Sequence, residues 1–212
     1  MRVLVACEYS GIVRDAFTAA GHEAMSCDLL PTESPGPHYQ GNALDVLHDG
    51  WDLMVCHPPC QYLSHAGTRH WHAPGRAEKR NLAVEFAMEL YNAPIQYVAM
   101  ENPKGHLGRA FRPPDQYINP FQFGEPVRKR IGLWLKGLPL LESTENLLPP
   151  PPVLTQHRKI SGKVKARHFV ETATDWKTRS KFFPGIAAAM AAQWGDPERL
   201  ARLGRQQQLF AA

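Results

Sequence analysis

Two chemically reactive side chains follow two apolar segments of this chain of 212 residues. Cys60 stands behind two prolines in residues 52–67, DLMVCHPPCQYLSHAG, and Glu101 directly follows the apolar run 95–100. A cysteine attacks electrophiles as its thiolate, and a carboxyl group can donate or hold a proton. The pair therefore indicates a substrate that needs both a sulfur nucleophile and a proton donor. Taken alone, each has a plainer interpretation, as a buried thiol and as an acid at a sheet edge.

The residues before Cys60 predict the start of a parallel sheet. Residues 2–6 form an apolar strand, and the helix that follows is capped by Ser10 and closes at Gly21. Residues 22–27 form a second strand that ends at Asp28. Strand, helix and strand in this order make a βαβ unit, from which parallel sheets are built.

The same alternation continues as far as Glu101. Residues 31–41 are rich in proline and glycine, which predicts a loop. The next predicted elements are a strand, a helix and a strand, at residues 52–56, 76–91 and 95–100. Ligands of open parallel sheets bind beyond the carboxyl ends of the strands, which is where Asp28, Cys60 and Glu101 stand.

After residue 105 the pattern changes. Residues 116–123 and 130–135 are predicted strands joined by a turn, so an antiparallel hairpin completes the sheet. Four consecutive prolines at 149–152 open an inserted segment, and a helix is predicted at 184–193. The chain is therefore expected to be an α/β protein with a mostly parallel sheet.

The bulk composition is that of a soluble globular protein, with 43% hydrophobic and 21% charged residues. No run of about 18 apolar residues is present, so no membrane-spanning helix is expected. The N-terminal residues lack the apolar segment and cleavage site of a signal peptide. We therefore expect a cytoplasmic protein with reduced thiols.

The cysteines other than Cys60 have a structural interpretation. Cys7, Cys27 and Cys56 are expected to be core residues within strands. Five potential metal ligands lie close together in the sequence, namely Cys56, Cys60, His65, His70 and His72. Their spacing matches no common zinc pattern, so no metal is expected.

The charges are distributed unevenly. Residues 1–105 carry a net charge of −5 and residues 106–212 a net charge of +9. The sharpest basic segment is 157–168, HRKISGKVKARH, with five Lys and Arg residues and no acid. Such a segment is typical of contact with a polyanion, and a solvated loop is the alternative.

Several motifs occur in the order typical of cytosine-5 DNA methyltransferases, and the chain resembles a small, phage-like member of that family. The most specific matches are the nucleophile loop, Pro58-Pro59-Cys60-Gln61 with Ser64 and Gly67, and the pair Glu101-Asn102. Residues 123–130, FGEPVRKR, resemble the segment that ends in Arg-x-Arg. Weaker matches are Tyr9-Ser10-Gly11-Ile12, Asp28, Gly41-Asn42 and Gly185.

The resemblance implies a Rossmann-like, S-adenosylmethionine-dependent methyltransferase fold, with DNA as substrate and its cytosine flipped out or single-stranded. It assigns catalysis to Cys60, Glu101, Arg128 and Arg130. It assigns cofactor contacts to Tyr9, Ser10, Gly11, Asp28, Asn42 and Pro58. It assigns substrate contacts to Pro59, Gln61, Ser64 and Asn102, to which the basic segment adds Arg158, Lys159, Lys163, Lys165 and Arg167.

The implied reaction explains these residue types. Carbon 5 of cytosine is too weak a nucleophile to take a methyl group from a sulfonium, so Cys60 would first add to carbon 6. Glu101 would neutralise the charge that develops at ring nitrogen 3. Arg130, together with Arg128, would hold the oxygen at carbon 2.

The expected domain division leaves little room for recognition of DNA sequence. Residues 1–136 and 179–212 are assigned to the catalytic domain, and 137–178 to a short, basic, proline-rich inserted segment. An inserted segment this short leaves several possibilities open. The protein is expected to discriminate weakly between DNA sequences, to obtain the missing contacts from a homo-oligomer or an accessory recognition subunit, or to act on a cytosine nucleotide. A phage or prophage origin suits so small a chain. The resemblance also implies a role in restriction and modification.

Departures from the family pattern leave two other functions open. Val13 and Arg14 replace glycines of the first motif, and Pro126 and Ile186 replace a glutamine and an asparagine. One alternative is an exocyclic-amino methyltransferase; the segment His57-Pro58-Pro59-Cys60 partly imitates the loop with which such enzymes hold an amine. The other is a non-catalytic relative that binds DNA.

Overall fold

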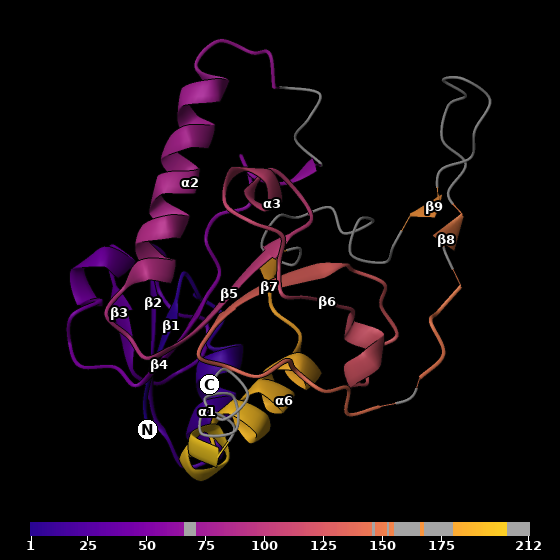
Figure 1. Ribbon diagram of the computed structural model, residues 1–212. Helices are drawn as coiled ribbons and strands as arrows, with labels where there is room; N and C mark the ends of the chain where they lie inside the picture. Colours follow the sequence, from indigo (N-terminus) through magenta and orange to yellow (C-terminus); the bar gives the residue numbers. More distant parts are fainter. Residues whose placement is uncertain (66–70, 146, 152, 155–165, 168–179, 203–212) are drawn as a thin grey trace, which may run out of the picture.

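A sheet of seven strands forms the centre of the protein, in the order β3-β2-β1-β4-β5-β7-β6 (Figure 1). The computed structural model describes residues 1–65, 71–145, 147–151, 153–154, 166–167 and 180–202. The strands are β1 (Arg2–Ala6), β2 (Glu23–Asp28), β3 (His38–Gln40), β4 (Leu53–Cys56), β5 (Tyr97–Pro103), β6 (Gln116–Ile118) and β7 (Ile131–Lys136). The helices are α1 (Ile12–Ala19), α2 (Arg76–Asn92), α3 (Leu107–Ala110) and α6 (Pro184–Trp194), with 3-10 turns η1 (Ala43–Val46) and η3 (Pro120–Phe123).

The first five strands are parallel, and β7 lies antiparallel between β5 and β6. This confirms the predicted α/β, Rossmann-like architecture with an antiparallel end. None of the helices in the described part of the chain is both long and apolar enough to cross a membrane.

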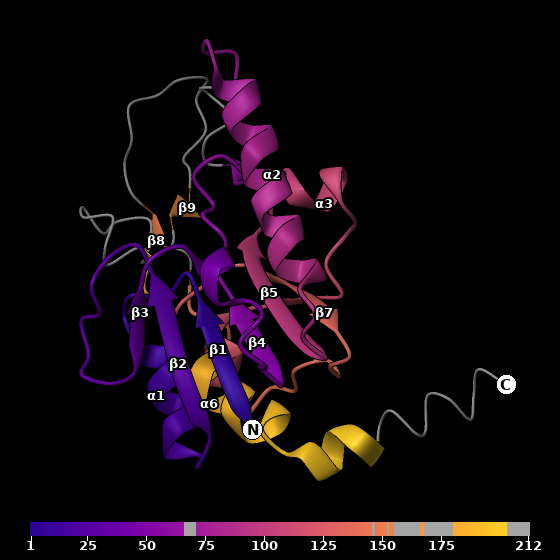
Figure 2. The same ribbon diagram turned by 90° about the vertical axis from the view of Figure 1, so that its left-hand side faces the viewer.

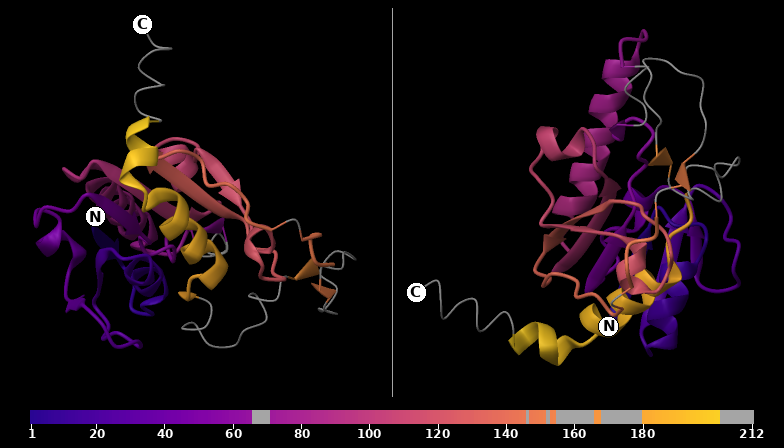
Figure 3. Two further views of the ribbon diagram at one scale, coloured as in Figure 1. Left: turned by 90° about the horizontal axis from the view of Figure 1, so that it is seen from below. Right: turned by 90° about the vertical axis from the view of Figure 1, so that its right-hand side faces the viewer.

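Helices cover both faces of the sheet, so alternate residues of its central strands enter two different cores. Val3 and Val5 of β1 pack with α1 and α6, whereas Leu4 and Ala6 pack with α2 and η1. Figures 2 and 3 show α1 and α6 together on one face and α2 on the other. Burial on both faces explains why β1 and β4 are continuously apolar rather than alternating.

Three of the predicted segments differ from the structure by more than one residue. Residues 31–41 do not form only a loop, because β3 lies within them and pairs with β2. The strand predicted at 95–100 runs on to Pro103, so Glu101 lies inside β5. The strand predicted at 116–123 ends at Ile118, since Pro120 begins the 3-10 turn η3 and cannot donate to a ladder.

The inserted segment that was predicted at 137–178 lies partly outside the described residues. Within it, β8 (Val153–Leu154) and β9 (Ala166–Arg167) pair with each other and not with the central sheet. Four of its predicted DNA contacts lie outside the described residues, namely Arg158, Lys159, Lys163 and Lys165.

Gly185 has a packing role in the first turn of α6. A Cβ atom on this residue would overlap the backbone carbonyl oxygen of Phe123. The backbone N–H of Gly185 donates to Glu125 Oε1 at 2.5 Å. We therefore expect Gly185→Ala to lower the free energy of unfolding by about 1–3 kcal/mol, as overpacking does. Urea denaturation measures this change. Gly108→Ala in α3 is the control, because a Cβ there meets nothing within 4 Å; equal effects of both substitutions would contradict the packing role.

Candidate active site

The strand order reverses between β1 and β4, and this places a crevice at their carboxyl ends. From β1 the chain passes to β2 on one side, and β4 lies on the other side. Such a switch point is where open α/β sheets bind their ligands. The segments that border it are residues 7–11, after β1, and residues 57–60, after β4.

The nucleophile loop that carries Cys60 is fixed to the end of β5. The side-chain amide of Asn102 donates to the carbonyl oxygen of Pro58 at 2.8 Å, and the N–H of His106 donates to Leu63 at 2.6 Å. Ser64 forms a β-bridge with Gly105, where a Cβ would collide with the backbone of residue 63. The loop is therefore held against β5 while Cys60 stays exposed.

Glu101 and His57 form a pair beside this loop. Cys56 and Met100 are paired in register on the parallel strands β4 and β5, so the residues that follow them are neighbours. Nδ1 of His57 lies 3.3 Å from Oε2 of Glu101, with side chains 12% and 13% exposed. The sequence did not predict His57 as a partner of Glu101. The signal for it is that each residue directly follows a member of the register pair Cys56 and Met100.

The four cysteines differ in exposure, and Cys60 is the exposed one. Burial is the main cause that raises the pKa of the other three thiols. The pKa of Cys27 rises to about 12, and those of Cys7 and Cys56 are also raised. Cys27 and Cys56 lie in strands as predicted, but Cys7 follows β1 with a left-handed backbone (φ 62°).

Iodoacetamide at about pH 8 is expected to alkylate Cys60 before the other cysteines of the folded protein. Thiolates react and thiols do not, and a raised pKa keeps Cys7, Cys27 and Cys56 in the thiol form. Peptide mass spectrometry over a time course measures the four rates. Denatured protein is the control, in which the rates become similar; similar rates in folded protein would contradict the burial of the three thiols.

The turn after β1 is built around a buried carboxylate. Glu8 accepts from the N–H groups of Val13 at 2.7 Å and Arg14 at 3.2 Å, so it satisfies the start of α1. The hydroxyl of Ser10, the predicted helix cap, accepts from the N–H of Ile12 at 3.4 Å and donates to Glu8 at 3.1 Å. The residue at the N-cap is Gly11, whose φ of 77° favours glycine.

Arg14, which departs from the family glycine, is fully buried. Its guanidinium donates to the hydroxyls of Ser26 and Thr32 and to the carbonyls of Ser34 and Pro35. The side chain thus fills the space beside the first turn and organises the loop that leads to β3.

A small pocket lies against this turn, lined by Cys7, Glu8, Tyr9, Ser10, His57, Ser180 and Phe182. The hydroxyl of Tyr9 lies 2.8 Å from that of Ser180, and the ring of His57 packs on Phe182 with centroids 4.7 Å apart. Ser180 and Phe182, which are distant in sequence from this turn, therefore form one wall of the pocket.

The other predicted cofactor residues lie at the ends of β2 and β3. The backbone N–H of Gly41 donates to the Asp28 carbonyl at 2.9 Å, so these two segments adjoin. The carboxylate of Asp28 accepts from Leu30, and the side chain of Asn42 caps η1 by accepting from Leu44.

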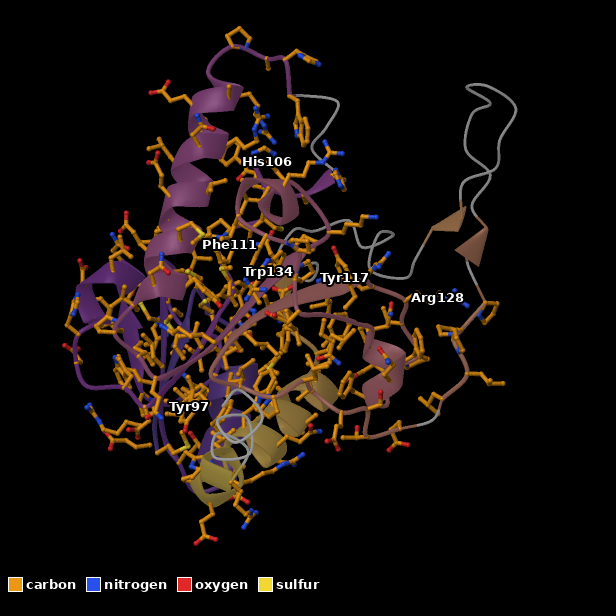
Figure 4. All side chains as sticks on the ribbon, in the orientation of Figure 1. Tyr97, His106, Phe111, Tyr117, Arg128 and Trp134 are labelled. Carbon is orange, nitrogen blue, oxygen red and sulfur yellow. The ribbon has the colours of Figure 1, made fainter. Side chains whose placement is uncertain are left out.

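The two predicted catalytic arginines have separate partners, and Figure 4 shows Arg128 apart from Tyr117. The Nε of Arg128 donates to the carbonyl of Pro150 at 2.6 Å, and Arg130 stacks over Tyr117, 4.0 Å from its ring centroid. The residue after Arg130, Ile131, pairs with Pro103. Arg130 therefore stands at the same sheet edge as Glu101, whereas the guanidinium of Arg128 is held by the chain after β7.

Among the described residues no group of three or more His, Cys, Asp and Glu side chains could hold a metal ion. Two residues of the predicted substrate set, Pro59 and Gln61, are exposed beside Cys60. The nucleophile loop, Glu101 and the pocket thus meet at one edge of the sheet.

The chain matches no protein-family model and no curated protein. Among solved structures it is similar to a protein from E. coli, encoded within a prophage and assigned as a DNA modification methyltransferase. The two chains are 14% identical, with a TM-score of 0.42 over 64% of this chain and 46% of the other. This chain therefore spans less than half the length of that neighbour.

Proposed function

We propose that the protein transfers a methyl group from S-adenosylmethionine to carbon 5 of cytosine in DNA, through a covalent bond to Cys60. The observation that carries this proposal is the exposed Cys60 thiol on a loop fixed to β5, the strand that contains Glu101. A sulfur nucleophile and a carboxyl group on adjoining strand ends are what attack at carbon 6 of cytosine requires.

The crevice fits a cationic nucleoside better than a dinucleotide. In dinucleotide-binding folds, the free N–H groups at the start of the first helix bind a pyrophosphate. Here the Glu8 carboxylate already accepts hydrogen bonds from the backbone N–H groups of Val13 and Arg14. A second acid, Asp28, ends β2, where such folds hold a ribose hydroxyl. These acids suit S-adenosylmethionine, which carries a sulfonium and a ribose but no phosphate.

The chain's own residues perform three parts of the reaction. The Cys60 thiolate adds to carbon 6, and the electron pair displaced from the double bond makes carbon 5 nucleophilic. Glu101 supplies a proton to ring nitrogen 3, which neutralises the charge that develops there. When bound, S-adenosylmethionine supplies the methyl group that carbon 5 takes. The carbon 5 proton then passes to solvent and the nitrogen 3 proton returns to Glu101, which restores the double bond and expels Cys60 as thiolate.

Arg130 is the arginine best placed to hold the oxygen at carbon 2, because its backbone adjoins the end of β5. Arg128 remains a proposed contact of the same kind. DNA is proposed as substrate because the segment 157–168 carries five positive charges, more than one nucleotide phosphate requires. The inserted segment at 137–178 is proposed to supply these contacts.

A trapping experiment tests the proposal. The protein is incubated with tritium-labelled S-adenosylmethionine and DNA that contains 5-fluorocytosine, whose fluorine cannot leave as the carbon 5 proton does. A labelled protein–DNA adduct on a denaturing gel is expected. Its absence, with N4-methylcytosine as the product from ordinary DNA, would instead establish an exocyclic-amino methyltransferase. Binding of DNA without methylation would establish a non-catalytic relative.

A further inference from the structure

Arginine and aromatic side chains gather beside the nucleophile loop, on the side of α2 and α3. We define this basic–aromatic patch by its residues Tyr62, Trp71, Arg76, Arg80, His106 and Arg109. Arg76 stacks over Tyr62 at 4.3 Å and Arg80 over Trp71 at 5.0 Å. Trp71 meets His106 edge to face, with ring centroids 5.9 Å apart. Figure 4 shows His106 at α3, alongside α2.

The patch contains buried hydrogen-bond donors with no acceptor among the described residues. These atoms are Nε1 of Trp71, Nε of Arg76, and Nε and Nη1 of Arg80. A buried donor without an acceptor is destabilising, because it has lost its hydrogen bonds to water. All four atoms can only donate, so the group that would satisfy them is an acceptor, and an anionic one meets the arginines best.

Within the described residues, the positive charges of the patch also lack carboxylate partners. Arg76 and Arg80 lie one turn apart on α2, where like charges repel, and neither forms an ion pair within the described residues. Burial, followed by the charges of Arg80 and Arg109, lowers the pKa of His106. Its ring is therefore neutral at pH 7, and it adds no charge to those of the arginines.

The patch is connected to the reacting thiol through the backbone. Nη2 of Arg76 donates to the carbonyl oxygen of Gln61 at 2.7 Å, directly after Cys60. The N–H of His106 donates to the carbonyl of Leu63 in the same loop. An anion held by these side chains would thus lie next to the loop that approaches the target base.

We propose that the basic–aromatic patch binds a backbone phosphate of the DNA strand that carries the target cytosine. Guanidinium groups match phosphate oxygens in geometry as well as charge. This deepens the proposed function, on which it rests, and adds a DNA contact within the otherwise acidic first half of the chain. Because Arg76 also holds Gln61, the contact positions the strand relative to Cys60.

Arg80→Ala tests the proposal by equilibrium binding rather than catalysis. The variant is made in Cys60→Ala protein, so that no covalent adduct forms, and a fluorescein-labelled oligonucleotide is titrated by anisotropy at several salt concentrations. We expect Kd to rise about tenfold, and the slope of log Kd against log salt to fall by about 1, as for loss of one phosphate contact. Arg80→Lys is expected to give an intermediate Kd, because it keeps the charge but not the fork.

Arg202→Ala is the matched control. It removes one positive charge from a residue whose partner is Glu198 at 3.9 Å, and it is expected to leave Kd nearly unchanged. Unaltered Kd and salt slope in Arg80→Ala, or no DNA binding by the parent protein, would overturn the proposal. If Arg80→Ala weakens binding but the trapping experiment gives no adduct, the patch stands and the proposed chemistry fails.

Discussion

Cys60→Ser is expected to lower kcat/KM for cytosine methylation by about 10³-fold or more, as removal of a covalent nucleophile does. A hydroxyl in the same place is far less ionised than a thiol at neutral pH, so addition to carbon 6 becomes the slow step. The loop is expected to keep its position in the variant, because the substitution leaves its anchors Asn102 and His106 unchanged. Transfer of tritium from S-adenosylmethionine to DNA measures the rate.

Two further measurements show whether the loss of activity in Cys60→Ser comes from the missing nucleophile. Cys27→Ser removes a buried thiol whose sulfur donates to the Gly41 carbonyl, a bond that a hydroxyl can also make, and it is expected to retain most activity. DNA binding of Cys60→Ser is expected to equal that of the parent protein. Undiminished methylation in Cys60→Ser would refute the covalent mechanism.

Glu101→Gln is expected to lower kcat/KM by about 10²- to 10⁴-fold, the usual contribution of a general acid. That loss corresponds to about 3–5 kcal/mol of transition-state stabilisation. The amide has nearly the same shape, and its oxygen can still accept from His57 Nδ1, which lies 3.3 Å from the carboxylate in the parent protein. What the substitution removes is the proton that reaches ring nitrogen 3.

The control for this prediction is Glu142→Gln, which changes a carboxylate that pairs with Arg199 at the surface. Exposed pairs contribute little to stability, so its kcat/KM is expected to stay close to that of the parent protein. A Glu101→Gln variant as active as Glu142→Gln would show that Glu101 is a structural acid of β5 and that another group protonates the base.

The larger part of the fold could be predicted because hydrophobic patterning decides it. The strands at 2–6 and 52–56 are short apolar runs, which parallel sheets need because both of their faces are buried. The strand β3 could not be predicted, since residues 31–41 are rich in proline and glycine. It forms because Ser26, Cys27 and Asp28 of β2 offer a parallel edge to residues 38–40, a tertiary effect that local composition does not contain.

In the candidate site, positions at strand ends were predictable and side-chain partners were not. That Cys60 and Glu101 lie near each other stays a prediction, drawn from the ends of parallel strands meeting at one edge; the structure holds the Cys60 loop to β5 through Asn102. The bond between His57 and Glu101 depends on the register of β4 against β5. The Arg128 guanidinium could not be placed from the sequence, because its partner, Pro150, lies after β7 in a segment with no periodic pattern.

The segment that closes the small pocket is made late in synthesis. Ser180 and Phe182 border that pocket, and Lys181 between them pairs with Glu33 at 2.7 Å. A nascent chain that has emerged as far as β7 therefore displays Cys60 and Glu101 before this wall of the pocket exists. The exposed thiol is thus present on the ribosome before the small pocket is complete, and for the proposed methyl transfer this predicts that activity begins only once α6 has folded against α1.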